Sequence, residues 1–175
     1  MKVRAVLALA AAIAFAMTAT ADDSKGHKPA KKSAGLEQFK QLAGEWVGKM
    51  KDENNQMRDV TTKYAVTSAG SAVVETMGAG TPHEMVNVIH QDGGDLALTH
   101  YCAIGNQPHM KAADKPGQKF EFVFTSGSNM ASDHDGHMHS VTYTLVDKDT
   151  LQEVWTFYEG GKKSGTATFD YKRKK

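Results

Sequence analysis

The strongest constraint on the fold is a period-two alternation of apolar and polar residues that runs from Gly44 to the C-terminus. Side chains along a β-strand point alternately to opposite faces, so this pattern predicts strands with one buried face. Turn-forming residues interrupt the pattern about every 8 to 12 positions, as expected for hairpins between sequence neighbours. Strands are expected over 44–51, 58–67, 71–78, 84–91, 95–102, 107–113, 119–126, 137–146, 150–158 and 164–172. We therefore predict an all-β fold, an antiparallel up-and-down β-barrel of about 8–10 strands, because closure leaves no exposed sheet edge.

Residues 1–21 have the pattern of a secretory signal peptide. They begin with the basic residues Lys2 and Arg4, continue with an apolar run, and end in small residues at Ala21. This order predicts cleavage after Ala21 and a secreted or periplasmic protein. The apolar run is shorter than the roughly 20 residues that a helix needs to span a bilayer. We therefore expect no stable insertion into a membrane.

The segment between this leader and the alternating region contains one predicted helix. Residues 22–34 are rich in lysine and small residues and have no apolar period, so we expect a flexible linker. The spacing of Leu36 and Phe39 predicts one short N-terminal helix that ends at Gly44. Residues 35–175 are then expected to form a single domain, with the helix preceding the barrel.

Composition and charge limit the classes of function. The chain is 40% hydrophobic and 23% charged, which is typical of a globular protein. Its formal net charge of +1 indicates no nucleic-acid partner. Cys102 is the only cysteine, so no intramolecular disulfide can form. No nucleophile elbow or phosphate-binding glycine loop is present, so an enzyme is not indicated, and no feature predicts an oligomeric state.

A Gly-x-Trp motif, formed by Gly44 and Trp46, stands between the predicted helix and the first strand. This arrangement resembles the calycin superfamily, which includes lipocalins and fatty-acid-binding proteins. The resemblance implies that Trp46 closes the bottom of the barrel beneath a basic residue of the last strand. Arg173 shares the parity of Phe169 and Tyr171, so we expect it to cover Trp46 in a cation–π contact.

Five short stretches resemble a family of secreted bacterial proteins that has no assigned activity. These stretches are 71–76, 80–85, 99–102, 105–108 and 136–139. The resemblance covers most of the chain after the leader. It implies a shared fold and export from the cytoplasm, and it implies no reaction.

Histidines are concentrated in the middle of the chain, where seven of the eight lie between His83 and His139. Alternation is expected to point several of them, with polar neighbours, into the barrel near its mouth. The expected ligand-binding residues are Glu84, His90, His100, Cys102 and Tyr143 in the interior, and Asn106 and Gln107 at the rim. The alternative is that these histidines face solvent, or that tyrosine, glutamate and backbone groups satisfy them inside.

His137 and His139 form a His-x-His pair on one predicted strand. Residues two apart on a strand lie about 6 to 7 Å from each other on the same face. Two such imidazoles suit chelation of Zn²⁺, Cu²⁺ or Fe²⁺, and His100 is a third candidate ligand. A divalent transition metal is therefore a candidate cofactor. Haem is not favoured, because the many methionines are more simply explained as core residues.

Three functions are consistent with these features. The leading hypothesis is a protein that binds a small, partly apolar ligand inside the barrel, with His100, His137, His139 and Glu84 as polar anchors. The alternative is a metal-binding protein or metal-dependent enzyme built on His137 and His139. The third is a structural or interaction module without a small-molecule site.

Overall fold

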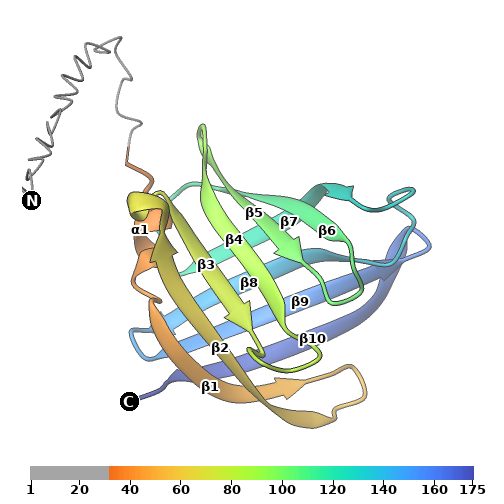
Figure 1. Cartoon of the computed structure of the whole chain (residues 1–175), viewed down its shortest axis with the longest axis horizontal. Helices are drawn as coiled ribbons and strands as arrows, with labels where there is room; N and C mark the ends of the chain where they lie inside the picture. The colour runs from red at the N-terminus through yellow and green to blue at the C-terminus, as the bar shows by residue number, and fades with distance from the viewer. Residues whose placement is uncertain (1–31) are drawn as a thin grey trace, which may run out of the picture. The chain divides into compact units, whose positions relative to one another are not determined.

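The computed structural model describes residues 32–175, which form ten antiparallel strands, a short α-helix and one turn of 3₁₀ helix, η1 (Ser68–Gly70). The strands are β1 (Gly44–Lys51), β2 (Met57–Thr67), β3 (Ala72–Met77), β4 (Met85–Asp92), β5 (Asp95–Tyr101), β6 (Gln107–Ala113), β7 (Lys119–Ser128), β8 (His137–Asp147), β9 (Thr150–Glu159) and β10 (Lys162–Arg173). Each strand pairs with its sequence neighbours, and β10 pairs with β1 to close the barrel (Figure 1). The predicted all-β, up-and-down barrel is confirmed. The expected signal peptide and most of the expected linker lie outside the described residues.

The helix α1 (Ala34–Lys40) lies at one end of the barrel (Figure 1). Ser33 caps it, because the Ser33 side-chain oxygen accepts a hydrogen bond from the Leu36 N–H at 2.9 Å. Leu36 and Phe39 are buried on the face that meets the barrel, and the Phe39 ring lies 5.0 Å from that of Phe120. The helix therefore begins inside the segment expected to be linker, because the Ser33 cap starts it two residues earlier.

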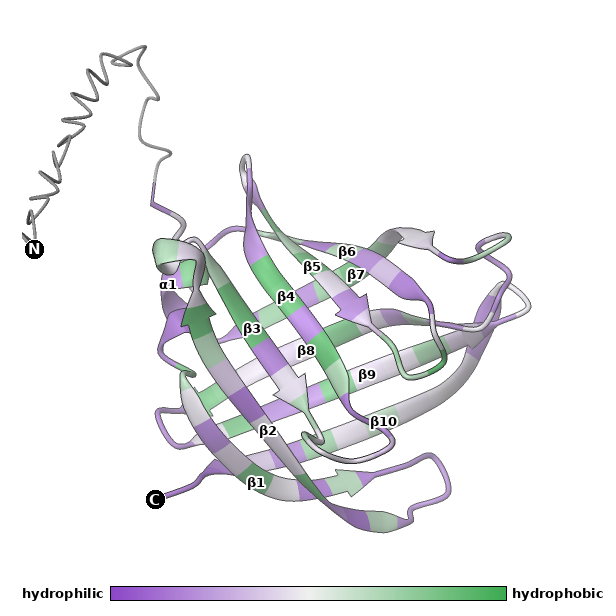
Figure 2. Ribbon diagram, in the orientation of Figure 1, coloured by the Kyte–Doolittle hydropathy of each residue, from purple (hydrophilic) through white to green (hydrophobic). Residues whose placement is uncertain are grey.

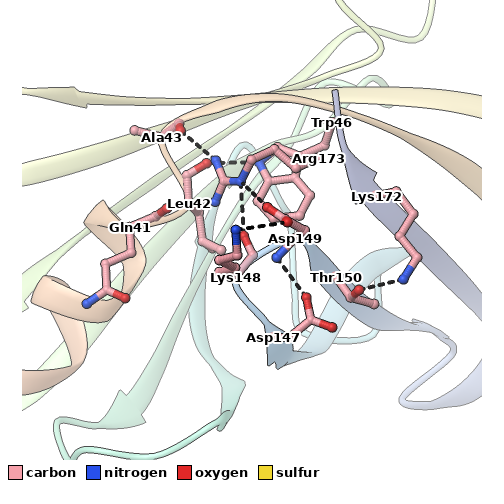
Figure 3. A network of polar contacts seen from close by, with 10 residues as sticks. All are labelled: Gln41, Leu42, Ala43, Trp46, Asp147, Lys148, Asp149, Thr150, Lys172 and Arg173. Atoms are coloured by element: carbon pink, nitrogen blue, oxygen red, sulfur yellow. Dashed lines mark hydrogen bonds and ion pairs between the residues drawn. The ribbon is translucent and has the colours of Figure 1, made fainter. Parts of the chain in front are cut away.

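The end of the barrel next to α1 is closed by Trp46. This side chain is 0% exposed, and its indole N–H donates a hydrogen bond to the Leu42 carbonyl at 2.8 Å. The Arg173 guanidinium carbon lies 4.3 Å from the centre of the Trp46 ring, and Figure 3 shows it between α1 and the β8–β9 turn. Arg173 also donates hydrogen bonds to the carbonyls of Gln41 and Ala43, each at 2.8 Å. The predicted cation–π contact is confirmed.

Gly44 allows Arg173 to occupy this position. Its φ of +130° lies outside the range that L side chains readily adopt. A Cβ at this position would also lie 3.2 Å from the Arg173 guanidinium. Glycine at position 44 therefore lets the chain turn from α1 into β1 without displacing the arginine.

All ten described strands contribute buried apolar or aromatic side chains to one core. Examples, in strand order, are Trp46, Tyr64, Val73, Ile89, Leu98, Met110, Phe122, Val141, Leu151 and Tyr171. Hydrophobic and hydrophilic bands alternate along the strands, as Figure 2 shows. Burial of each such side chain contributes about 1.5 to 3 kcal/mol, so the core accounts for much of the stability of a chain without disulfides.

The connections alternate between the two ends of the barrel because every strand reverses direction. The β2–β3, β4–β5, β6–β7 and β8–β9 connections lie at the end that Trp46 closes (Figure 1). The β1–β2, β3–β4, β5–β6, β7–β8 and β9–β10 connections lie at the opposite end, which we call the open end. Within residues 32–175, no helix has both the length and the apolar character to cross a bilayer.

Candidate functional site

Two buried carboxyl groups lie in the interior of the barrel. Glu75 on β3 and Glu153 on β9 are both 0% exposed. The Tyr64 hydroxyl donates a hydrogen bond to Glu153 Oε1 at 2.6 Å, and the Trp155 indole N–H donates one to Oε2 at 3.0 Å. Burial first, and then the neighbouring Glu75 carboxyl, raise the pKa of Glu153 well above its usual range.

Glu75 accepts hydrogen bonds from three different strands. Thr62 Oγ1 donates to Oε1 at 2.9 Å. Asn87 Nδ2 and the Tyr143 hydroxyl donate to Oε2 at 2.8 and 3.0 Å. An unsatisfied buried polar group costs about 1 to 3 kcal/mol, so loss of one partner is expected to destabilise the others. We refer to Thr62, Tyr64, Glu75, Asn87, Tyr143, Glu153 and Trp155 as the interior network.

His100 extends the interior network toward the open end. Its Nδ1 lies 2.7 Å from Asn87 Oδ1, and Asn87 uses its amide nitrogen for Glu75. Because Asn87 Oδ1 can only accept, we assign the ring proton to His100 Nδ1. Burial lowers the pKa of His100 to about 4, so the ring is neutral at physiological pH. His100 Nε2 is then an acceptor, and it has no hydrogen-bond partner among the described residues.

A cavity of about 380 Å³ lies at the open end above Trp155, and we call it the open-end cavity. Its residues come from the β1–β2 turn and from β8, β9 and β10: Asp52, Glu53, Asn54, Met138, Trp155, Phe157, Glu159, Ser164, Gly165, Thr166 and Ala167. The Trp155 ring is packed against that of His100, with the ring centres 4.8 Å apart. The open-end cavity therefore has an aromatic base that rests on the interior network.

Gly165 permits the β1–β2 turn to form one side of the open-end cavity. A Cβ at position 165 would lie 2.8 Å from Oε2 of Glu53. The missing side chain therefore leaves room for the Glu53 carboxylate beside β10. Asp52 and Glu159 add two further carboxylates to the lining, and no lysine or arginine lines the cavity.

His137 and His139 lie where β7 and β8 separate at the open end. Pairing between these strands stops at Val123 and Ser140. His137 is 1% exposed and lies against Phe124, with ring centres 4.3 Å apart. His137 Nδ1 lies 2.7 Å from the Asp135 carbonyl, which can only accept, so we place a ring proton on that nitrogen. In the neutral ring, Nε2 then accepts from His139 Nδ1 at 3.1 Å.

The two histidines of this pair differ in burial, and a register shift separates them from Val141 and Tyr143. Both residues were expected on the inward face of Val141 and Tyr143. The pairing of β8 with β9 shifts register between Met138 and Ser140, which is a β-bulge. Because of this shift, Met138 lines the open-end cavity, while His139 stacks on Tyr158 with ring centres 3.7 Å apart.

The structure does not bring His100 together with the histidine pair. His100 contacts Asn87 and Trp155, whereas His137 and His139 contact each other, Phe124 and Tyr158. Across residues 32–175, no three His, Cys, Asp or Glu side chains are arranged to hold a metal ion. The three-histidine metal site suggested by the sequence is therefore not formed.

The inward orientation expected for Glu84 and His90 is also wrong. Both side chains are exposed, and the buried residues of β4 are Asn87 and Ile89. The apolar run around Val88 is consistent with either face of the strand, so alternation alone does not determine which side chains of β4 are buried. Glu84 instead accepts a hydrogen bond from a backbone N–H within the β3–β4 connection. His90 lies near the opposite end, close to the β4–β5 turn.

The remaining candidates lie in the interior or in the β5–β6 connection. Tyr143 is buried and belongs to the interior network. Cys102 is half-buried, and burial raises the pKa of its thiol. Asn106 is buried and donates to the Gly136 carbonyl at 2.8 Å, which ties the β5–β6 and β7–β8 connections together. Gln107 is half-buried and donates to a carbonyl of its own loop.

Sequence reasoning missed Glu75, Glu153 and Trp155. A signal was available for the last two, because Leu151, Glu153 and Trp155 share one parity in a predicted strand. That parity places the carboxyl group between two core residues. The partners of these side chains come from distant strands, which alternation alone does not identify.

No protein-family model matches the chain, and no curated protein matches it. Fifteen chains of solved structures match. One is a protein of unknown function from the DUF3598 family of Nostoc punctiforme PCC 73102, with a TM-score of 0.54 and 14% identity. That match covers 78% of this chain and 49% of the other, so this chain spans about half of that protein.

A weaker match is the protein EF1p2_mFAP2b bound to DFHBI, with a TM-score of 0.36 and 12% identity. It covers 82% of this chain and all of the other. Only the first match is close enough to bear on the fold. Together with the closed barrel and the contact between Arg173 and Trp46, it fits a calycin-like fold.

Proposed function

We propose that this protein binds a small, partly apolar molecule in the open-end cavity. The observation that carries the proposal is a cavity of about 380 Å³ with an aromatic base at one end of a closed barrel. Ligand sites are commonly concave, with volumes of about 300 to 1,000 Å³, and the mouths of β-barrels are among their preferred places. The volume suits a molecule the size of one or two fused rings with a short substituent.

The lining of the cavity combines apolar and polar groups in separate places. Trp155, Phe157 and Met138 provide two aromatic rings and a polarisable thioether. Rings of a ligand can stack on such side chains at little cost in side-chain entropy. The charged groups stand on the β1–β2 turn and at the end of β9, and Ser164 and Thr166 add hydroxyl groups from β10. This division favours a ligand with an apolar body and one polar end.

The negative charge at the rim of the cavity favours a ligand whose polar end is cationic. Asp52, Glu53 and Glu159 line the cavity without a basic side chain among the lining residues. None of the three forms an ion pair among the residues that the structure describes. An ammonium group beside aromatic rings gains about 0.5 to 2 kcal/mol from the ring quadrupole. A carboxylate ligand would instead meet three like charges.

We also propose that the protein acts outside the cytoplasm. The proposal rests on the order of basic, apolar and small residues in residues 1–21. Expression in a bacterial host with separation of the periplasm tests it. The exported protein is expected to begin at Asp22, as read by intact-mass spectrometry, and an uncleaved cytoplasmic chain would contradict the proposal.

Two dansyl compounds that differ in charge test the ligand site. Dansylcadaverine is cationic and dansylglycine is anionic, while the fluorescent ring is the same. We expect the cation to bind more tightly in a fluorescence titration. Ala167→Phe should fill the cavity and weaken binding roughly tenfold or more, which corresponds to about 1.4 kcal/mol. Thr168→Phe is the matched control, because Thr168 follows Ala167 on β10 and does not line the cavity.

Equal affinity of the wild type and Ala167→Phe would contradict binding in the cavity. Tighter binding of dansylglycine than of dansylcadaverine would contradict the proposed charge preference. Circular dichroism of both variants confirms that the barrel is intact before the titrations are compared.

A further inference from the structure

We propose that His137 and His139 form a two-imidazole chelate for one divalent transition-metal ion, with Cu²⁺ preferred. The site lies between β7 and β8, and neither histidine lines the open-end cavity. The inference is therefore independent of the proposed ligand site. Its basis is the relative position of two ring nitrogens and the contacts that hold both rings.

The two nitrogens are separated by a distance that one metal ion can bridge. His137 Nε2 lies 3.1 Å from His139 Nδ1. With metal–nitrogen bonds of about 2.0 to 2.1 Å, this separation gives an N–metal–N angle of about 95 to 100°. That angle lies between those of neighbouring ligands in tetragonal and tetrahedral coordination. The ion would lie to one side of the line between the two nitrogens and would replace the hydrogen bond that now joins the rings.

The hydrogen bonds of His137 match those that usually orient a metal-binding histidine. Its Nδ1–H donates to the Asp135 carbonyl at 2.7 Å, which leaves the Nε2 lone pair directed at His139. Metal-binding histidines almost always donate the other ring N–H to a carbonyl or carboxylate, which fixes the tautomer and the ring orientation. Phe124 packs against this ring and limits its rotation.

His139 can supply its Nδ1 lone pair through a change of tautomer. Its ring stacks on Tyr158 at 3.7 Å with an interplanar angle of 12°, which holds the plane of the ring. The proton leaves Nδ1 and is carried by Nε2 of the same ring after exchange with water. Within the ring only the two N–H bonds change, so the ring stays neutral, and the two imidazole nitrogens replace two water ligands of the ion.

The donor set favours Cu²⁺ among the common divalent ions. Imidazole nitrogen binds Zn²⁺, Ni²⁺ and Cu²⁺, and affinity for a given nitrogen site is highest for Cu²⁺. No third His, Cys, Asp or Glu completes a cluster within residues 32–175, so water completes the coordination.

Copper titration of the full chain tests the site, with electron paramagnetic resonance as the readout. The wild type is expected to bind one Cu²⁺ with nitrogen hyperfine structure from two imidazoles. Loss of even an outer partner of a metal ligand typically costs 10- to 100-fold in affinity, so loss of His139, which is itself a ligand, should cost at least about tenfold. His139→Phe removes the ligand and keeps an aromatic ring on Tyr158.

His134→Ala is the matched control, because His134 is an exposed histidine five residues before His139. It should bind Cu²⁺ as the wild type does. Absence of a one-to-one complex in the wild type would overturn the inference, as would unchanged affinity and spectra in His139→Phe. An equal loss in His134→Ala would also overturn it. Thermal unfolding of each variant checks that the barrel is folded.

Discussion

Polar side chains inside the barrel are held in particular protonation states by burial. Burial and the neighbouring Glu75 carboxyl both raise the pKa of Glu153. His100 stays neutral because burial lowers its pKa to about 4. The neutral state of His100 fits its hydrogen bond, since the ring donates at Nδ1 to Asn87 and leaves Nε2 as an acceptor. His100 Nε2 can therefore accept a hydrogen bond from a donor placed above the interior network.

The burial of His100 predicts a specific dependence of stability on pH. The pKa of His100 is lower in the folded protein than in the unfolded chain, where it is about 6.5. The unfolded state therefore binds more protons between these two values, and the wild type loses stability as pH falls from about 6.5 to 4. His100→Gln cannot titrate and lacks this loss. The stability difference between the wild type and His100→Gln should shrink by about 3 kcal/mol over that range.

Urea denaturation at intervals between pH 7 and pH 4 measures this difference. Glu153 also titrates with a raised pKa, so the wild-type curve alone combines two effects. Subtracting the His100→Gln curve removes the shared contributions. A difference that stays constant from pH 7 to pH 4 would show that His100 is not held neutral.

Individual strands were predicted well, and their orientation less well. The boundaries of the expected strands agree with the observed ones to within two residues, because alternation and turn residues are local signals. The predicted orientation was wrong at β4, and the start of β8 departs from simple alternation for a different reason. In β4 the run Val86-Asn87-Val88-Ile89 is consistent with either face. In β8 the bulge after Met138 reverses the parity, and it depends on pairing with β9.

The candidate site was predictable only in part for the same physical reason. An up-and-down barrel places the connections that follow β1, β3, β5, β7 and β9 at the same end. The position of these connections could therefore be predicted from the sequence. The open-end cavity depends on the absence of side chains at Gly165 and on the bulge that turns Met138 inward. The interior network depends on contacts between residues as far apart as Tyr64 and Glu153. Such contacts are set by the closed barrel as a whole.

The last strand, β10, carries Arg173, whose contacts stabilise the closed end. Arg173 donates to the carbonyls of Gln41, Ala43 and Lys148, and its guanidinium lies over Trp46 (Figure 3). Arg173→Lys keeps the charge but removes the planar fork that reaches several acceptors at once. We expect a loss of about 2 to 3 kcal/mol in the free energy of unfolding, measured by urea denaturation.

Lys172→Ala is the control for this change, because Lys172 is exposed on the same strand. Its effect should stay within about 0.5 kcal/mol. If Arg173→Lys were as stable as the wild type, the guanidinium contacts would contribute nothing beyond charge. The role assigned to Arg173 would then be wrong.

The two ends of the barrel have different roles, because one end is packed and the other carries the proposed binding sites. Its closed end is filled by α1, Trp46 and Arg173, whereas its open end carries the cavity and the histidine pair. The interior network lies between them and joins β2, β3, β4, β8 and β9 through buried hydrogen bonds. Rigid strands thereby position the base of the cavity, while the connections at the rim are free to differ in shape and charge.

The two tryptophans allow the proposed binding site to be tested in one experiment. Trp155 lies at the base of the open-end cavity, and Trp46 lies in the closed end, so each end carries one indole N–H. A ¹H–¹⁵N correlation spectrum resolves both signals during titration with dansylcadaverine. We expect the Trp155 signal to shift with saturation while the Trp46 signal stays in place. A bound probe that shifts Trp46 alone, or neither indole, would contradict binding in the open-end cavity.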